Sequence, residues 1–420
     1  MKTKQHYLAL YSQNEAQICQ HSQAVLNAPR AEAFATFEQK GFPRKGEEDY
    51  IHTDMAQAFA LALPTSQLQT SSFEFSCSNA NADAYIGGLA DFAQKHPDIA
   101  ARYYGKAALS ERDCIAALNT MFVKDGFVIY IPKGVCIEEP IRLSNIFSAN
   151  TDSIEHRRLL IILEAQAEAH LIITDKNEGK AKLLFTQVVE IFAEDGAVFD
   201  LYDLEENAAL TTRFTSVFVQ QATNSNVLVN ATTLTNGRTR NNYYVDLLGE
   251  NSEAMLCGMA IEDKEQEVDT FSVITHHLPY CTSHELFKNV LDDSALGAFS
   301  GRILVKEGAD KTEAYQTNRN LCATDRCRMY SKPQLEIYAD DVRCSHGMTT
   351  GQLDENAMFY LRSRGISKEE ARMMLSVAFT ADVIDLVRIE SHKELLYHLV
   401  DKRLRDKLAT PSEATAKDGE

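Results

Sequence analysis

The stretch 168-EAHLIIT-174 is a polar start that enters a run of apolar and β-branched side chains. Similar four-residue starts recur further along the chain, at Gly196-Ala197-Val198-Phe199, Ser225-Asn226-Val227-Leu228, Glu253-Ala254-Met255-Leu256 and Ser283-His284-Glu285-Leu286. The steps between these starts are 28, 29, 28 and 30 residues. A nearly constant step with strand-like texture is typical of a solenoid, in which each coil stacks on its neighbours. The repeat therefore predicts a β-helix, whereas a flat sandwich would show turn signals every 8–12 residues without a long repeat.

The same texture extends well beyond the five aligned starts. Short β-rich runs separated by turn residues follow one another from about Gly126. Prolines are few between residues 126 and 347, and we expect no helix there. The sequence predicts a mainly β protein with a β-helix core over residues 111–347.

Helical periodicity precedes this core. Residues 5–26 and 31–39 carry apolar side chains at three- and four-residue spacing, which indicates two amphipathic helices. A further helical stretch is expected over residues 82–110, with an interruption at Pro97. Residues 1–110 are therefore expected to form an N-terminal helical domain with a linker.

Helical signals return after the core. Asp354 can cap one helix, and Ser367 and Ser391 each begin a Ser-x-x-Glu capping box that opens another. We expect a C-terminal helical domain over residues 348–408. Residues 409–420 lack apolar content, so they are expected to form a disordered tail.

Composition and charge restrict the class of protein. The 420 residues are 45% hydrophobic and 24% charged, as in globular proteins, and they exceed what one compact core usually holds. The formal net charge of −18 repels phosphate groups, so nucleic acids and anionic membranes are poor partners. No apolar run approaches the ~20 residues that span a bilayer, and the first residues lack an apolar signal-peptide core. A cytoplasmic location is expected.

The common enzyme signatures are missing from the sequence. It contains no Gly-x-x-x-x-Gly-Lys-Ser/Thr phosphate loop and no Gly-x-Gly-x-x-Gly dinucleotide fingerprint that opens a helix after a strand. Neither a Gly-x-Ser-x-Gly elbow nor a His-Glu-x-x-His pair occurs. We therefore expect no enzyme of these classes.

A group of sulfur and imidazole side chains near the end of the β region is the candidate for metal chemistry. Period-two alternation puts Val342, Cys344 and His346 on one strand face, where residues two apart lie ~7 Å from each other. A thiolate and an imidazole at that spacing could share zinc, iron or an iron–sulfur unit. Cys322 and Cys327 lie upstream, and one coil of a solenoid could bring Cys327 near the Cys344 strand. Cys344 could equally be an ordinary buried thiol, and His346 could simply bond to backbone at a turn.

Three segments carry a resemblance to a known family. Residues 332–342 (KPQLEIYADDV), 344–347 (CSHG) and 359–366 (FYLRSRGI) closely resemble the C-terminal signature of the SufD family, the scaffold subunits of SUF iron–sulfur cluster assembly. Residues 31–53 are similar to that family's N-terminal helical motif. The related SufB family shares parts of the signature but carries a cysteine-rich N-terminal motif that is missing here.

The resemblance implies an N-terminal helical domain, a right-handed parallel β-helix and a C-terminal helical domain. It implies a non-catalytic subunit that pairs with a SufB-like scaffold and binds two copies of a SufC-like ABC-type ATPase. A transient iron–sulfur cluster would form at the SufB interface and not in the isolated chain. His346 matches the family's histidine implicated in cluster building, Cys344 lies in the same motif, and Cys327 falls near the cluster cysteine of SufB-like sequences.

The resemblance also implies which residues contact partners. The C-terminal helices would contact the ATPase, and the end of the β-helix would pair with the SufB-like subunit. The partner-binding residues expected from the matched motif are Phe359, Tyr360, Arg362, Arg364 and Gly365.

Two functions of other classes remain open from the sequence. A self-contained zinc- or iron-binding metalloprotein would use Cys322, Cys327, Cys344 and His346 together. A β-helix enzyme acting on carbohydrates would show an exposed acidic and aromatic groove along the solenoid. The sequence also leaves open whether the isolated chain forms a homodimer.

Overall fold

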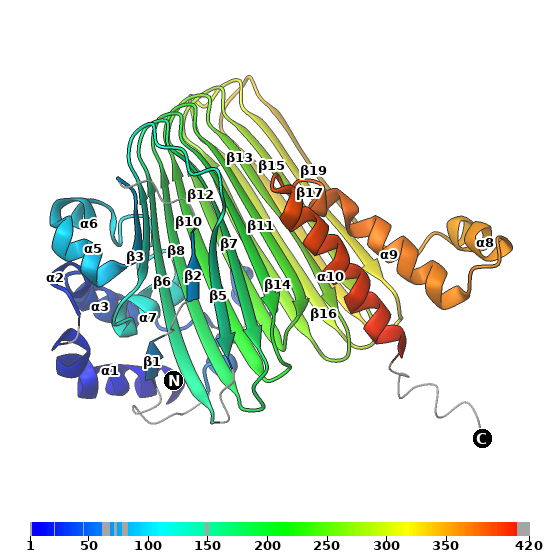
Figure 1. Cartoon of the computed structure of the whole chain (residues 1–420), viewed down its shortest axis with the longest axis horizontal. Helices are drawn as coiled ribbons and strands as arrows, with labels where there is room; N and C mark the ends of the chain where they lie inside the picture. The colour runs from blue at the N-terminus through cyan, green and yellow to red at the C-terminus, as the bar shows by residue number, and fades with distance from the viewer. Residues whose placement is uncertain are drawn as a thin grey trace.

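The computed structural model describes residues 2–20, 22–44, 46–60, 68–70, 74–77, 83–147 and 151–409. Its centre is a parallel β-solenoid of about eight turns (Figure 1). N-terminal helices lie against one side of the solenoid and C-terminal helices against the other (Figure 1). The mainly β class with helical flanks, predicted from the sequence, is confirmed.

Two sheets form the walls of the solenoid. Sheet A contains, in spatial order, β18 (Arg328–Ile337), β16 (Leu296–Val305), β14 (Glu267–His276), β12 (Arg238–Leu247), β10 (Thr211–Gln221), β8 (Leu183–Ala193), β6 (Ser153–Leu163), β4 (Phe127–Ile131) and β3 (Tyr85–Gly88), with β1 (Leu68–Thr70) paired to β6. Sheet B contains β19 (Arg343–Gly351), β17 (Glu313–Cys322), β15 (Thr282–Leu291), β13 (Glu253–Glu262), β11 (Asn226–Thr235), β9 (Val198–Glu206), β7 (Glu168–Asn177), β5 (Ile141–Phe147) and β2 (Glu74–Ser76). Neighbouring strands run parallel, except that β3 pairs antiparallel with β4 and β2 with β5.

The predicted repeat corresponds to the strands of sheet B. From β7 to β19 these strands begin 27 to 31 residues apart, and each pairs in parallel with the next along the sheet. Glu168 pairs with Val198, which pairs in turn with Asn226, and Asn226 pairs with Glu253. The aligned sequence starts lie within two residues of these partners.

The N-terminal helices pack on the outer face of sheet A. They are α1 (Lys2–Gln20), α2 (Ala24–Asn27), α3 (Arg30–Lys40), the 3₁₀ helix η1 (Glu48–Tyr50), α4 (Met55–Ala58), α5 (Leu89–Lys95), α6 (Pro97–Tyr103) and α7 (Cys114–Phe122). The helices expected over residues 5–26 and 31–39 are present, although the first is divided into α1 and α2.

Two features of this region differ from the expectation. Residues 85–88 form β3, not the start of a helix, because they extend sheet A by pairing with β4. The α7 helix lies within the range 111–347 that was expected to be β-helix. Its residues from Ile115 to Phe122 are all buried, so no polar face marks a helical period.

The C-terminal helices are α8 (Glu355–Ser363), α9 (Lys368–Ile384) and α10 (Glu390–Ala409). Asp354 and Ser367 accept backbone N–H hydrogen bonds at the starts of α8 and α9, as expected of N-caps. The expected cap at Ser391 is wrong, because α10 already begins at Glu390. The expected tail at 409–420 lies, except for Ala409, outside the described residues.

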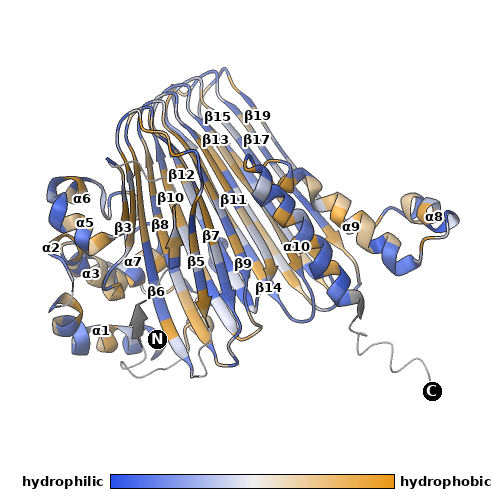
Figure 2. Cartoon of the chain, viewed as in Figure 1, coloured by the Kyte–Doolittle hydropathy of each residue, from blue (hydrophilic) through white to orange (hydrophobic). Residues whose placement is uncertain are grey.

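Three apolar layers hold these parts together. One fills the solenoid, one joins the N-terminal helices to the outer face of sheet A, and one joins α9 and α10 to the outer face of sheet B. Figure 2 shows apolar segments along the strands of the solenoid. On the helices α1 and α10 it shows apolar and polar segments in alternation. On the last strands of the solenoid, Met329 and Leu335 of β18 and Cys344 of β19 are partly buried against the layer inside the solenoid.

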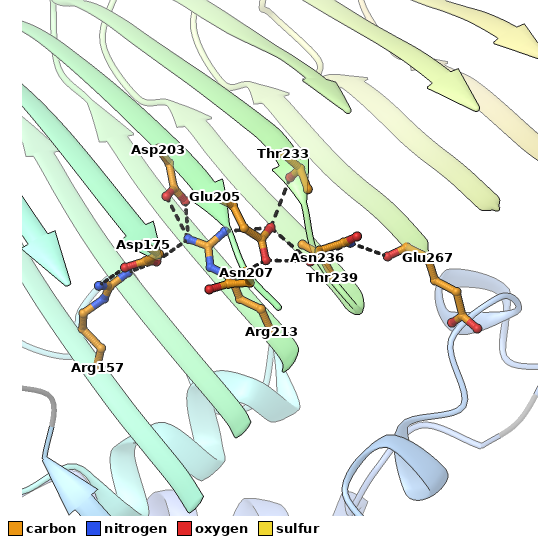
Figure 3. Close-up of polar contacts among 10 residues, drawn as sticks. All are labelled: Arg157, Asp175, Asp203, Glu205, Asn207, Arg213, Thr233, Asn236, Thr239 and Glu267. Atoms are coloured by element: carbon orange, nitrogen blue, oxygen red, sulfur yellow. Dashed lines mark hydrogen bonds and ion pairs between the residues drawn. The ribbon is translucent and has the colours of Figure 1, made fainter. Parts of the chain in front are cut away.

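The inside of the solenoid also contains a buried polar network (Figure 3). Arg157 donates two hydrogen bonds of 2.6 Å to Asp175, and Arg213 donates to Asp203 at 2.7 and 2.8 Å. Burial alone would raise the pKa of Asp175, but Arg157 and Arg213 hold that pKa below its usual value. The network ties four neighbouring strands together from within.

Candidate functional site

The last coil of the solenoid, made of β18 and β19, is the candidate site. β19 ends the spatial order of sheet B, so β17 is its neighbour on one side and no strand among the described residues pairs with its other side. The same is true of β18 in sheet A. An unpaired edge presents free backbone N–H and C=O groups to any strand that approaches it.

The N-terminal segment covers part of the outer face of β18. His52 stacks on Tyr330 with ring centroids 4.1 Å apart, and Lys332 forms an ion pair with Glu48. Sheet A is thus supported up to its last strand. The side chains of β19 are exposed, except for the half-buried Cys344.

The strand register determines which β19 side chains face inward. Cys344 lies opposite Ala314 of β17, and His346 lies opposite Gln316. Ala314 and Gln316 are buried, at 0% and 1% exposure, because the last coil covers them. No further coil among the described residues covers β19, and His346 is exposed on the open end of the solenoid.

Cys344 and His346 have different surroundings. Cys344 packs, with Val342, against the apolar layer inside the solenoid. Burial raises the pKa of the Cys344 thiol, although a hydrogen bond from the Ala314 backbone opposes the shift. The thiol is therefore protonated at neutral pH unless a metal displaces the proton.

The other two cysteines of the expected site, Cys322 and Cys327, lie at the opposite end of the strands from Cys344. The Cys327 thiol is buried and donates to the Thr324 carbonyl at 3.1 Å. Burial and the neighbouring Cys327 raise the pKa of Cys322 to about 12. These two thiols contact each other in the turn between β17 and β18.

The structure does not bring the two pairs together. Cys322 ends β17, whereas Ala314, the partner of Cys344, lies eight residues earlier on the same strand, a distance of roughly 26 Å. The expectation that one coil would bring Cys327 near the strand of Cys344 is wrong. Each coil crosses the solenoid and returns, so successive turns lie at opposite ends of the strands. Cys327 lies in one of these turns, and Cys344 follows the next one. Within the described ranges, no group of three His, Cys, Asp or Glu residues could hold a metal ion.

The expected partner-binding residues lie around α8, which projects past β19 on the side of the open end of the solenoid (Figure 1). α8 packs on α9 and projects away from the sheets. Phe359 and Tyr360 are 75% and 57% exposed, and the Arg364 guanidinium lies 5.2 Å from the centre of the Tyr360 ring. Arg362 is in the last turn of α8, and Gly365 follows with a φ of 87°, which favours glycine.

A polar change inside sheet B was missed from the sequence. One inward-facing row runs along consecutive strands of the sheet; its members are Ile141, Leu171, Leu201, Val229, Leu256, Glu285, Gln316 and His346. The first five are apolar and the last three are polar. An alignment of the coils in the correct register would have revealed this change.

Comparisons with known proteins identify the family. Residues 146–379 match the family described as "SUF system FeS cluster assembly, SufBD core domain". Residues 1–77 and 71–143 match the "SufBD protein N-terminal region".

Individual relatives carry consistent names. The "Iron-sulfur cluster assembly protein SufD" of Escherichia coli is 39% identical over 165 residues, which is 39% of this chain and 39% of that protein. A SufBD family protein of Synechocystis is 28% identical over 72% of this chain and 69% of the relative. The SufD protein of Bacillus subtilis is 25% identical over 74% of this chain and 72% of its own length. The match to the Escherichia coli relative thus spans well under half of that protein.

Proposed function

This chain belongs to the SufBD family of the SUF system, and from that premise we propose that it is a non-catalytic scaffold subunit for iron–sulfur cluster assembly in the cytoplasm. In this proposal the open end of the solenoid pairs with a SufB-like subunit. The C-terminal helices bind a SufC-like ABC-type ATPase. The iron–sulfur cluster is the cargo of the complex and forms transiently at the SufB-like interface.

The uncovered last coil is the observation that carries the proposal. Solenoids need a cap on each end, because an uncapped coil leaves its inner face and its strand edges open. Here Met348, inward-facing on β19, is 46% exposed, whereas its partner Asn318 on β17 is fully buried. A second solenoid that stacks its own last strands here would cover both the side chains and the edge.

His346 provides the chemistry of this interface. It is exposed on a rigid strand, and an imidazole nitrogen is a ligand for iron and zinc. A lone histidine cannot hold a cluster, so the remaining ligands have to come from the partner subunit. Cys344 lies two residues away on the same face and stays a candidate second ligand.

The surface around α8 supports the second interaction. Phe359 and Tyr360 expose aromatic rings, and aromatic and arginine side chains are enriched at the centres of interfaces. Nucleotide hydrolysis would then act on the scaffold through α9 and α10, which pack on sheet B.

The metalloprotein alternative finds less support. It requires Cys322 and Cys327 in one site with Cys344 and His346, and the register keeps these pairs roughly 26 Å apart.

An assembly experiment tests the role of His346. The chain is co-expressed anaerobically with SufB-like and SufC-like partners as wild type, as His346→Ala and as the control His398→Ala, an exposed histidine of α10. We expect cluster absorbance to be lost in His346→Ala and retained in His398→Ala, with the complex intact in both. Unchanged cluster formation in His346→Ala would overturn the proposed role.

A further inference from the structure

We propose that Glu285 and Gln316 are positioning residues that fix the imidazole of His346 through a hydrogen-bonded relay inside the last three coils. The inference rests on the proposed function, because it deepens the role of His346 at the open end. It assigns a task to two buried polar residues that the fold itself does not require.

The three residues are consecutive members of one row. Glu285 of β15 lies opposite Gln316 of β17, and Gln316 lies opposite His346 of β19. Paired residues on adjacent parallel strands face the same side of a sheet, and strands are ~4.8 Å apart. β15, which carries Glu285, is therefore only ~10 Å from β19, which carries His346, and Gln316 of β17 lies between them.

The contacts of Glu285 orient the Gln316 side chain. Gln316 Nε2 donates to Glu285 Oε2 at 2.6 Å, and Ser272 Oγ donates to Glu285 Oε1 at 2.5 Å. When ionised, the Glu285 carboxylate only accepts hydrogen bonds, so in that state it selects the NH₂ end of the glutamine amide. Glu285 thus determines which end of Gln316 points away from it.

The remaining end of Gln316 is an unused acceptor. Gln316 Oε1 is buried and has no hydrogen-bond partner among the described residues. Leaving a buried acceptor without a partner is unfavourable, so a donor is expected next to it. The next side chain in the row is His346, whose ring N–H is such a donor.

The backbone leaves room for this arrangement. Gly301 of β16 lies under Gln316, and a Cβ atom at Gly301 would come within 2.4 Å of Gln316 Nε2. The glycine therefore gives the amide its place beside Glu285.

The consequence for His346 concerns its tautomer. A ring nitrogen that donates to Gln316 Oε1 keeps its proton, and the other nitrogen is left unprotonated, which is the form that binds a metal. Metal-binding histidines are commonly oriented in this way by an acceptor for their second nitrogen. Glu285 and Gln316 would pre-organise His346 before any cluster arrives.

The tautomer of His346 can be measured in the full-length chain alone. The protein is labelled with ¹⁵N-histidine, and the His346 signals are identified by their loss in His346→Gln. We expect one dominant tautomer in the wild type. In Gln316→Leu the tautomer ratio should shift by roughly fivefold or more, the change expected when one hydrogen bond is lost.

Two further variants separate the relay from general effects on the core. Glu285→Gln keeps the size of the side chain but no longer selects one end of the Gln316 amide, so the ratio should shift here too. Gln187→Leu replaces another fully buried glutamine inside the solenoid, far from β19, and should leave the ratio unchanged. A wild-type ratio in Gln316→Leu, or an equal shift in Gln187→Leu, would overturn the relay.

The complex provides a second readout. If the relay orients His346, cluster formation in the co-expressed complex should fall in the variants that break it, Gln316→Leu and Glu285→Gln. Cluster formation should persist in the control Gln187→Leu. If His346→Ala leaves cluster formation unchanged, the proposed function fails, whereas the tautomer measurement still decides whether the relay exists.

Discussion

His346 lies opposite Gln316 in the register of β17 and β19, and the glutamine is 1% exposed while the histidine is on the surface. Two side chains of one inward row thus differ only in whether another coil covers them. This difference in exposure shows where the stack of coils ends. His346 is therefore the first position of the row that a partner subunit can reach.

A charge on the open face should block pairing with the SufB-like subunit. Met348→Asp puts a carboxylate on an inward position of β19, where the proposed interface would bury it without a partner at a cost of several kcal/mol. The isolated variant should fold normally, because Met348 is 46% exposed. Co-purification should be lost for Met348→Asp and kept for Leu395→Asp, which changes a similarly exposed residue of α10. Equal recovery of the complex with both variants would argue against this interface.

Glu285 should make stability depend on pH. Burial raises its pKa from 4.5 to about 7, although hydrogen bonds from Ser272 and Gln316 oppose the shift. The folded state then binds the proton more tightly than the unfolded state, so this contribution to stability is full below pH 4.5 and is lost as pH rises through about 7. The free energy of unfolding should fall by up to about 3 kcal/mol over that range because of Glu285.

The variant Glu285→Gln isolates this contribution. Denaturant unfolding at pH 5 and pH 8 gives the pH-dependent part for each protein. Burial also raises the pKa of Glu205 and Glu262, so some pH dependence should persist in the variant. An identical pH dependence in wild type and variant would show that Glu285 does not titrate in this range.

Breaking the buried network should be far more costly than breaking a surface ion pair. Asp175→Asn leaves the fully buried Arg157 and the neighbouring Arg213 without their shared counter-charge, and unfolding should become easier by about 3–5 kcal/mol. The exposed pair Lys95–Asp91 serves as the control, and Asp91→Asn should change the urea midpoint little. Similar midpoints for both variants would contradict the importance of the network.

Gly301 should tolerate no side chain. In Gly301→Ala the new Cβ would meet Gln316 Nε2 at 2.4 Å, and relieving that contact should cost about 1–3 kcal/mol of stability. Gly351→Ala is the matched control, because nothing lies within 4 Å of its Cβ position. Thermal unfolding of the two variants compares them directly. A normal melting temperature for Gly301→Ala would mean that Gln316 and the Phe299 ring, which the new Cβ would meet at 2.6 Å, both readily adopt other positions.

The solenoid could be predicted because every coil repeats the same physical pattern of polar starts and apolar strands. The inward-facing row of sheet B could not be predicted, because identifying its members requires the strand register to a single residue. The sequence alignment set Ser283 against Glu253, whereas the strands pair Thr282 with Glu253. A slip of one residue exchanges the two faces of a strand, so the inward position of Glu285 was hidden.

The candidate site was predictable in part for a similar reason. Alternation along one strand correctly places Cys344 and His346 on the same face, since this depends only on local geometry. The position of Cys327 depends on how each coil crosses from sheet A to sheet B. That path is set by turns whose lengths vary, and the sequence does not reveal at which edge each turn lies.

The native mass of the complex tests the central claim most directly. The tagged chain is co-expressed anaerobically with SufB-like and SufC-like partners, purified and weighed intact. The account predicts an assembly with one copy of this chain, one SufB-like subunit and two SufC-like subunits, and its loss in Met348→Asp. Recovery of this chain alone, or only as a pair of its own copies, with both partners absent, would contradict the account.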